Sequence, residues 1–265
     1  WNDFQKRLPT QIKRYELWKS NYSKAYYEIQ SSVLPTENND GVLWKLGSKQ
    51  TEATIFWTGK PSAKIAAKYS SPILIKNSGE VKAFQQIGTN RFGTISLNFG
   101  INKATGKKII SNIPPSPNYP GNGGLFSLVN GVKSERGINS SEWCGWSGKK
   151  IELILDLGKE MDIKEINLHI LSQESSWIYA PQSFEVEFSK DGITFEDTHH
   201  GFLDYEGAAD SKPMKWMKRK LSEDKSKTFP VRFIKLKVNA VDKIPAGNPG
   251  AGKPAWMFIG EIEVL

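Results

Sequence analysis

Cysteine is almost absent from this sequence. Cys144 is the only one in 265 residues, so no disulfide can form within the chain and its stability must come from a buried core. A single cysteine is unusual in an extracellular animal protein but ordinary in a periplasmic or surface protein of bacteria. Cys144 lies between Trp143 and Gly145 without a basic neighbour, which predicts a small buried residue rather than a reactive thiol.

The sequence also lacks a long apolar run, an initial methionine and a signal peptide. No stretch of 18 apolar residues occurs, so we expect no membrane span. The chain begins at Trp1 with neither a methionine nor a signal peptide, which we interpret as a fragment cut from a longer precursor. A length of 265 residues suits two domains of ordinary size, each with its own core.

Acidic residues are scarce in the N-terminal part only. Residues 1–104 carry 15 Lys and Arg against 7 Asp and Glu, while residues 105–265 carry 21 of each. The net charge of +8 therefore belongs to the first part. A nucleic-acid-binding protein normally concentrates such an excess on a recognition element, and no motif of that kind is present, so we expect no nucleic-acid partner.

Alternation of apolar and charged residues is the main secondary-structure signal. Segment 183–191 alternates apolar residues with glutamates, and segments 231–238 and 255–265 alternate in the same way, as strands with one buried face do. Asp191-Gly192 then supplies a turn into a further strand. Many short strands separated by Gly- and Pro-rich turns predict a mainly β protein built from sandwiches.

The N-terminal segment has a different pattern. Apolar residues recur at every third or fourth position from Phe4 to Trp18, which predicts one apolar face of a helix. Pro9 interrupts this pattern, so we expect either a short helix before Pro9 or a helix whose first turn contains it.

The order of motifs in the second part of the chain is more specific than any one of them. Tyr119-Pro120-Gly121-Asn122-Gly123 is followed by LVNG (128–131), EWCGWSG (142–148), IELILDLG (151–158), SFEVEFSKDG (183–192) and AWMFIGEIEVL (255–265). This order resembles the discoidin fold, also called the factor 5/8 type C domain or family 32 carbohydrate-binding module. The resemblance implies a jelly-roll sandwich that binds sugars.

The first part of the chain resembles a different piece of a known enzyme. Residues 1–22 look like the last helix of the catalytic barrel in bacterial β-N-acetylhexosaminidases of glycoside hydrolase family 20, and residues 53–84 look like the small immunoglobulin-like domain that follows it. These enzymes catalyse with an adjacent Asp-Glu pair, and this sequence contains no such dipeptide. The resemblance therefore implies a non-catalytic C-terminal region of a larger hexosaminidase. We expect its parts to be a helical tail of an absent catalytic barrel (1–24), an immunoglobulin-like sandwich (25–103) and a discoidin-like carbohydrate-binding domain (104–265).

Aromatic residues in polar loops are the best candidates for a sugar site. A pyranose offers a small apolar face that stacks on an aromatic ring, while its hydroxyls need polar partners. Trp177 and Tyr179 lie with Glu174 in the polar loop SQESSWIYAP, and we predict that they contact a glycan. Trp143 and Trp146 either contact the ligand too or plug one end of the sandwich.

The discoidin resemblance also implies a structural Ca²⁺ between the LVNG loop and the closing strand. By position its ligands are Asn130 and Glu261, with backbone carbonyls near Lys133 and Ser140. Asn130 stands where aspartate is more usual. The loss of one formal charge should weaken calcium binding.

Two further stretches allow more than one interpretation. Lys212–Lys220 is a basic segment around Trp216 that binds an anionic glycan or, alternatively, forms an outer strand whose lysines discourage edge pairing. The second stretch contains Glu196, Asp197, His199, His200, Asp204 and Glu206. These residues could form a metal or acid/base cluster, or they could lie in a polar surface loop. A third interpretation is that a histidine of this stretch contacts a sugar hydroxyl.

Taken together, the sequence predicts a non-catalytic accessory region that binds glycan termini of the N-acetylglucosamine or galactose type. Its partners would be glycans and an upstream catalytic barrel, and its location would be the periplasm, the surface or the exterior of a bacterium. The alternative is a structural spacer or oligomerisation module without a sugar ligand. A spacer would bury both Trp177 and Tyr179, whereas a binding site needs one of them exposed beside polar groups.

Overall fold

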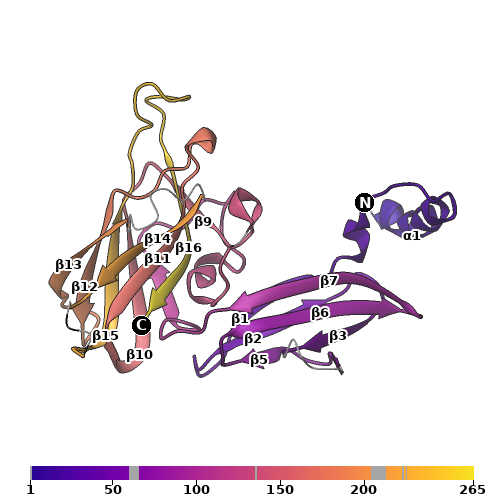
Figure 1. The fold of residues 1–265 in the computed structure, drawn as a ribbon, viewed down its shortest axis with the longest axis horizontal. Helices are drawn as coiled ribbons and strands as arrows, with labels where there is room; N and C mark the ends of the chain where they lie inside the picture. The colour runs from indigo at the N-terminus through magenta and orange to yellow at the C-terminus, as the bar shows by residue number, and fades with distance from the viewer. Residues whose placement is uncertain (1, 60–65, 135, 204–212, 223, 225) are drawn as a thin grey trace.

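The computed structural model describes the chain except residues 1, 60–65, 135, 204–212, 223 and 225, and it is mainly antiparallel β-structure (Figure 1). One helix, a small sandwich and a larger sandwich follow one another along the long axis of the molecule. None of the helices in the described part is both long and apolar enough to cross a membrane. The prediction of a mainly β fold with a short N-terminal helix is confirmed.

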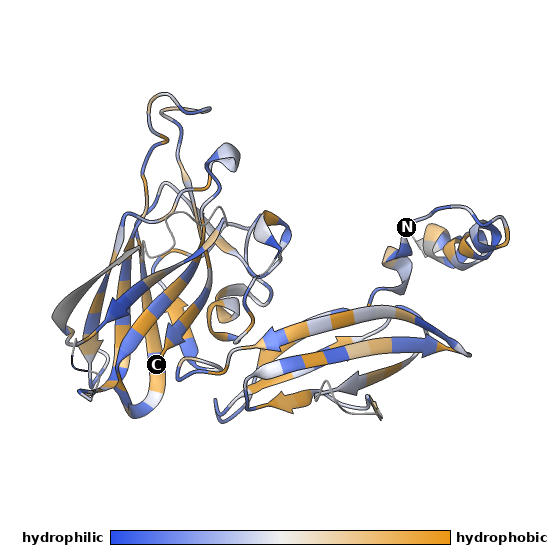
Figure 2. Cartoon of the chain, in the orientation of Figure 1, coloured by the Kyte–Doolittle hydropathy of each residue, from blue (hydrophilic) through white to orange (hydrophobic). Residues whose placement is uncertain are grey.

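Helix α1 (Asn2–Leu17) is continuous, and Pro9 lies inside it. Neither expected arrangement around Pro9 is therefore correct. A proline removes only one main-chain hydrogen bond of the helix, and the buried side chain of Ile12, 3% exposed, holds the following turn in place. Leu8 and Tyr15 are partly buried, whereas Phe4, Leu17 and Trp18 remain largely in solvent, 51%, 81% and 66% exposed. Figure 2 shows apolar positions on α1, which lies beyond the end of the small sandwich.

The small sandwich consists of a three-stranded and a four-stranded sheet, ordered β1-β2-β5 and β4-β3-β6-β7. Trp44 is fully buried between them and its indole N–H donates to Ser31 Oγ at 2.9 Å. A short 3₁₀ helix, η1 (Lys24–Tyr27), precedes the first strand. The strands are β1 (Gln30–Pro35), β2 (Val42–Gly47), β3 (Thr54–Thr58), β4 (Ala67–Lys68), β5 (Ile73–Ile75), β6 (Gly79–Ile87) and β7 (Asn90–Phe99).

The large sandwich is one nine-stranded antiparallel sheet folded onto itself, in the order β8-β10-β15-β12-β13-β14-β11-β16-β9. Strand β13 joins its two halves, because it pairs with β12 at one end and with β14 at the other. The apolar faces of both halves meet in a single core that includes Leu153, Ile234 and Ile262. The strands are β8 (Lys108–Ser111), β9 (Cys144–Ser147), β10 (Ile151–Ile163), β11 (Glu165–Leu171), β12 (Ser183–Ser189), β13 (Glu196–Leu203), β14 (Met214–Lys220), β15 (Phe229–Asn239) and β16 (Trp256–Val264).

Three short 3₁₀ helices lie in the loops of the large sandwich: η2 (Gly124–Val129), η3 (Gly137–Asn139) and η4 (Glu174–Ser176). The basic strand β14 pairs with β13 on one side and β11 on the other. It is therefore an interior strand, and its interpretation as an outer strand is wrong. Trp216 packs against the buried His169 of β11, with ring centroids 4.9 Å apart, while Lys218 and Lys220 remain exposed to solvent.

The two sandwiches share a tightly packed junction. The backbone N–H of Gly100, just after β7, donates to the carbonyl of Gly131 at 2.8 Å, and Phe99 forms a β-bridge with Val132. Val132 directly follows the LVNG loop of the large sandwich, yet its side chain is 4% exposed and packs in the core of the small sandwich. The loop is thus held by both domains.

A second contact at the junction requires glycine. Gly106 has a left-handed backbone with φ of +76°, and a Cβ on it would lie 2.3 Å from the carbonyl oxygen of Gly41 in the small sandwich. Lys107 strengthens the same contact, because its ammonium donates to the carbonyl of Asn39 at 2.7 Å. The sandwiches are consequently closer at this point than any side chain would allow.

Gly106→Ala should therefore destabilise the protein more than a matched substitution at Gly88. Both glycines have a left-handed φ, but a Cβ at Gly88 would have no neighbour within 4 Å. In both variants the alanine must adopt a left-handed backbone, which lowers the free energy of unfolding. Only Gly106→Ala adds a steric clash, which we expect to lower it by about 1–3 kcal/mol more. Denaturant unfolding measures the difference. Equal losses in the two variants would show that the sandwiches are not tightly packed at Gly106.

Candidate functional site

The loop at residues 172–181 lies between β11 and β12 at one end of the large sandwich, where the 242–254 loop also projects (Figure 1). Gln173 closes the loop by pairing its backbone with Ile178, and η4 occupies the turn between them. Trp177 ends η4 in the left-handed region, with φ of +64°. A bulky residue rarely adopts this conformation, so the loop holds the indole against a local backbone preference.

The Trp177 side chain is partly buried, and the 242–254 loop covers one side of it. A Cβ on Gly250 would lie 2.6 Å from the indole ring, so this position has room only for glycine. The ammonium of Lys253 lies 5.2 Å from the ring centroid, within the range of a cation–π contact. Glu174 and Ser175 beside the ring are exposed. The loop therefore presents part of an indole beside a carboxylate, a hydroxyl and an ammonium group.

The other three aromatic candidates are buried, which corrects the expectation that they contact a ligand. Tyr179 is 6% exposed and packs with Ile244 and Ala255, while Trp143 and Trp146 are 1% and 2% exposed. The indole N–H groups of the two tryptophans donate to main-chain carbonyls, of Gly137 at 2.6 Å and of Ile113 at 3.0 Å. These tryptophans fill one end of the sandwich, as their alternative interpretation has it.

Trp143 covers a buried histidine on the outer face of β11. The rings of Trp143 and His169 stack with centroids 5.2 Å apart, and His169 is only 5% exposed. Burial, together with the nearby Lys133 ammonium, lowers the pKa of His169 to about 4. The histidine is therefore neutral at physiological pH, and its position between aromatic rings is structural.

The LVNG loop surrounds two buried carboxylates. The side-chain amide of Asn130 donates to Glu142 at 2.8 Å, while its oxygen accepts the backbone N–H of Val132 at 2.7 Å. Asn122 donates to the second oxygen of Glu142 at 2.8 Å. On the closing strand, one oxygen of Glu261 accepts the backbone N–H of Gly131 at 3.2 Å. Asn130 and Glu261 are thus brought to the same loop, as the resemblance implied.

The chemistry around Glu261 fits a hard cation. Its second carboxylate oxygen is buried without a hydrogen-bond partner among the described residues, and a few residues after the LVNG loop the hydroxyl of Ser134 is likewise buried without one. Burial raises the pKa of Glu261 well above its usual range, and burial likewise raises that of Glu142. A bound cation would remove the cost of charging both groups. Within the described ranges no three His, Cys, Asp or Glu side chains cluster, so such an ion would also need amide, hydroxyl and carbonyl oxygens.

The two remaining residues of the predicted metal site have other contacts. The hydroxyl of Ser140 accepts the backbone N–H of Glu142 at 3.3 Å, so it helps to shape the loop. The Lys133 ammonium pairs with Glu263 at 2.7 Å and lies 4.9 Å from the Trp216 ring centroid. At Lys133 only the main-chain carbonyl is a suitable cation ligand, because the ammonium carries the wrong charge.

Sequence reasoning missed several residues of both regions. The sequence around Glu142 does not indicate a buried carboxylate beside the LVNG loop. Lys253 and Gly250 are far from Trp177 in sequence, so their contacts with the indole could not be predicted. Of the acidic and histidine-rich stretch, residues 196–203 form β13, whereas Asp204 and Glu206 lie outside the described residues, as does Lys212 of the basic segment. Cys144 is buried, and burial raises the pKa of its thiol to about 12, in line with an unreactive side chain.

Several solved structures are similar to this chain. A fucose-binding module of Streptococcus pneumoniae has 16% identity and a TM-score of 0.42, with 62% of this chain and 94% of that chain covered. The lectin domain of Lectinolysin complexed with Lewis B antigen has 14% identity and a TM-score of 0.41, covering 63% and 97%. Chitosan-binding module 1 of a chitosanase/glucanase from Paenibacillus sp. IK-5 has 12% identity and a TM-score of 0.37, covering 63% and 99%.

Among curated proteins no sequence matches this chain. The family model of the F5/8 type C domain matches residues 113–251, which lie within the large sandwich and make up more than half of the chain. The matched residues include the motifs at 119–123, 128–131, 142–148, 151–158 and 183–192. The chain therefore belongs to the F5/8 type C domain family.

Proposed function

We propose that the large sandwich binds glycan termini at the loop that carries Trp177. The observation that carries this proposal is a partly exposed indole, held in a strained backbone conformation, beside exposed polar side chains. Strain of this kind persists where the surrounding structure enforces it, and it is frequent at binding sites. A spacer would bury all the aromatic residues of this loop, and only Tyr179 is buried.

The contacts of Trp177 restrict how a sugar would bind. Lys253 and Gly250 occupy one side of the indole, so a pyranose would stack on the part that remains open. Glu174 would accept from sugar hydroxyls, and the Lys253 ammonium would donate to them. A single shallow contact of this size should bind weakly. Its effect would come from raising the local concentration of substrate around an attached enzyme. A periplasmic, surface or secreted location would suit this role.

Replacing Trp177 should abolish glycan binding. Loss of the ring removes a stacking contribution of about 1–3 kcal/mol, which is enough to erase a weak interaction. We expect Trp177→Ala and Trp177→Asn to lose all signal on a glycan array that carries N-acetylglucosamine and galactose termini. Asn is included because it tolerates the left-handed backbone better than Ala does. The melting temperature should fall only slightly, because the ring is partly buried.

The matched control is Trp18→Ala, which removes another indole, 66% exposed, far from the loop. This variant should bind like the original protein. Normal binding by both folded Trp177 variants would contradict the proposal, and so would an original protein that binds no glycan on the array.

We further propose that the chain is the C-terminal region of a β-N-acetylhexosaminidase of glycoside hydrolase family 20. Exposed apolar side chains at and just after the two ends of α1 support this, since Phe4, Leu17 and Trp18 leave apolar surface that a preceding domain would cover. A cavity of about 700 Å³ lies between α1 and η1 and is lined by Phe4, Leu8 and Tyr15 among others. The motifs of residues 1–22 and 53–84 support the same parentage.

This proposal predicts that the chain alone hydrolyses no aryl N-acetylglucosaminide. The Asp-Glu pair that the reaction needs is missing from the sequence. A chromogenic assay of the pure protein measures turnover. Hydrolysis that co-purifies with the protein and responds to substitutions within this chain would contradict the assignment of catalysis to a preceding domain.

We also propose that the LVNG loop holds a structural Ca²⁺. The ligands would be the carboxylate of Glu261, the side-chain oxygen of Asn130 and main-chain carbonyls near Lys133 and Ser140. Glu142 would contribute negative charge from beside Asn130. The ion would fix the loop and take no part in sugar chemistry. The two orphaned buried oxygens and the two unfavourably buried carboxylates support this proposal.

Calcium should raise the melting temperature, and a chelator should reverse the rise, because an ion that binds only the folded state stabilises it by mass action. Glu261→Gln should lose the response. Without calcium this variant should be at least as stable as the original protein, because it no longer buries a charge. Glu152→Gln, on the exposed side of β10, serves as control and should keep the full response. A calcium response that survives Glu261→Gln would contradict the proposed ligand.

A further inference from the structure

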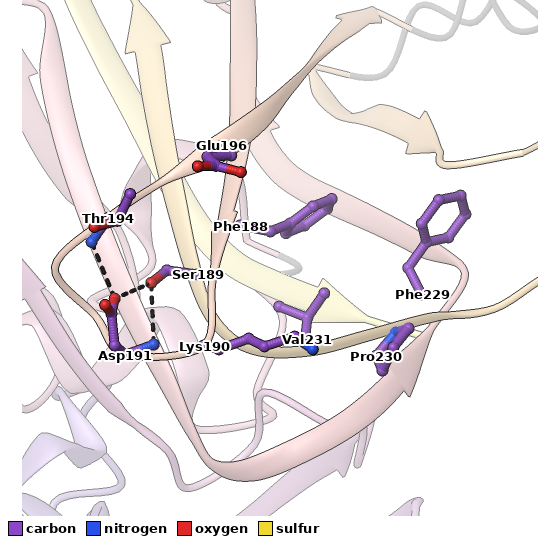
Figure 3. A pocket seen from close by; sticks show the side chains of 9 residues that line it. All are labelled: Phe188, Ser189, Lys190, Asp191, Thr194, Glu196, Phe229, Pro230 and Val231. Atoms are coloured by element: carbon purple, nitrogen blue, oxygen red, sulfur yellow. Dashed lines mark hydrogen bonds between the residues drawn. The ribbon is translucent and has the colours of Figure 1, made fainter.

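A cavity opens at the end of the large sandwich opposite the Trp177 loop. It measures about 450 Å³ and lies under the hairpin that joins β12 to β13 (Figure 3). Strand β12 begins next to the Trp177 loop and ends at this hairpin, and its seven residues span about 20 Å. A monosaccharide bound at the Trp177 loop is therefore too far away to reach this cavity.

The walls of the cavity combine two phenylalanine rings with an inward-facing carboxylate. Phe188 and Glu196 are directly opposite each other across β12 and β13, so their side chains lie on the same face of the sheet. Phe188 and Phe229 both pack against the core, and Val231 lies on the same wall. A glutamate on the core side of a sheet is costly unless it reaches water or a polar ligand. Glu196 is exposed, so the core-facing side of the sheet is open to solvent at this end.

The hairpin that forms the rim is held in one conformation. The carboxylate of Asp191 accepts the backbone N–H groups of Ile193 at 2.8 Å and Thr194 at 3.0 Å, and the hydroxyl of Ser189 at 2.8 Å. These bonds keep the pKa of Asp191 below its usual range, with the Ile193 N–H contributing most. Asp191 is thus occupied by its own turn. A preformed rim reduces the entropy lost when a ligand binds.

Other rim groups remain available to a ligand. Among the described residues Lys190 pairs with Glu160 at 3.7 Å, and both side chains are largely exposed, so the pair is weak. Thr194 carries a hydroxyl. Next to the lining residues, the ammonium of Lys227 lies 5.1 Å from the Phe229 ring centroid. The lining itself therefore offers the Glu196 carboxylate as an acceptor, the Lys190 ammonium as a donor and a hydroxyl that can donate and accept.

We infer that this cavity is a second sugar site that accepts a single pyranose residue. The phenyl rings match the apolar C–H face of a pyranose, and the mixed donors and acceptors match its hydroxyls, which each donate and accept. A free anion would be repelled by Glu196, and a free cation by Lys190 and Lys227. The volume is suitable for one ring rather than for a long chain.

Two sites at opposite ends of one rigid sandwich would make the chain bivalent. A single glycan terminus cannot occupy both, so the second site would engage another branch or another chain. Simultaneous binding raises the apparent affinity for a dense glycan surface without any stronger individual contact. This inference does not depend on the Trp177 site, because the two share no residue.

The test is an NMR titration of the whole chain with N-acetylglucosamine and, separately, with galactose, at millimolar concentrations. Backbone amides of residues 188–196 and 229–231 should shift saturably with at least one sugar. In Glu196→Ala the dissociation constant for this group of shifts should rise about tenfold, because a hydrogen bond to a charged acceptor is lost. Phe229→Leu keeps an apolar side chain in the wall and should weaken the same shifts by loss of stacking.

Trp177→Ala serves as the matched control and should leave the shifts at residues 188–196 unchanged. If those shifts vanish in Trp177→Ala, they report the other site and the inference is wrong. Absence of saturable shifts with both sugars, or shifts that Glu196→Ala and Phe229→Leu leave intact, would also overturn it. Failure of the Trp177 site alone would remove only the shifts near residues 172–181.

Discussion

The fully buried carboxylate of Glu261 is the constraint around which the junction of the two sandwiches is arranged. It lies on the closing strand β16 and accepts a hydrogen bond from Gly131, whose own carbonyl accepts from Gly100 at the end of the small sandwich. Val132, the next residue, inserts into the core of the small sandwich. Gly131 and Val132 therefore link this carboxylate to the neighbouring domain. A substitution that removes the hydrogen bond between Glu261 and Gly131 would affect the packing of both domains.

In the proposed account, different parts of the large sandwich provide stability and ligand binding. Its core is formed by strand residues that are almost all inaccessible, together with Trp143 and Trp146, whose indole N–H groups are satisfied by main-chain carbonyls. The two ends differ from this core, because each places an aromatic ring beside charged groups that reach solvent. At one end the ring is Trp177 with Glu174 and Lys253. At the other end the rings of Phe188 and Phe229 lie beside Glu196. A rigid sheet between them keeps the two ends at a fixed separation.

Much of the fold follows from local patterns in the sequence, and the site follows only in part. Alternation identified β12, β15 and β16, since a strand with one buried face must repeat every two residues. The same alternation cannot show which strands are neighbours, so the interior position of β14 was not foreseen. Local sequence patterns also could not predict which aromatic side chains of the loops are buried. Tyr179 and Trp177 are two residues apart in the same polar loop, yet only long-range packing against Ile244 and Gly250 determines which is covered.

The central claim is that Trp177 contacts sugar while the other aromatic candidates support the fold. The most direct measurement is the set of indole N–H resonances of the nine tryptophans during a titration with glycan termini. The claim predicts that the Trp177 resonance moves saturably. The resonances of Trp143 and Trp146, which are bonded to the carbonyls of Gly137 and Ile113, should stay in place. Movement of either buried indole without movement of Trp177 would contradict it.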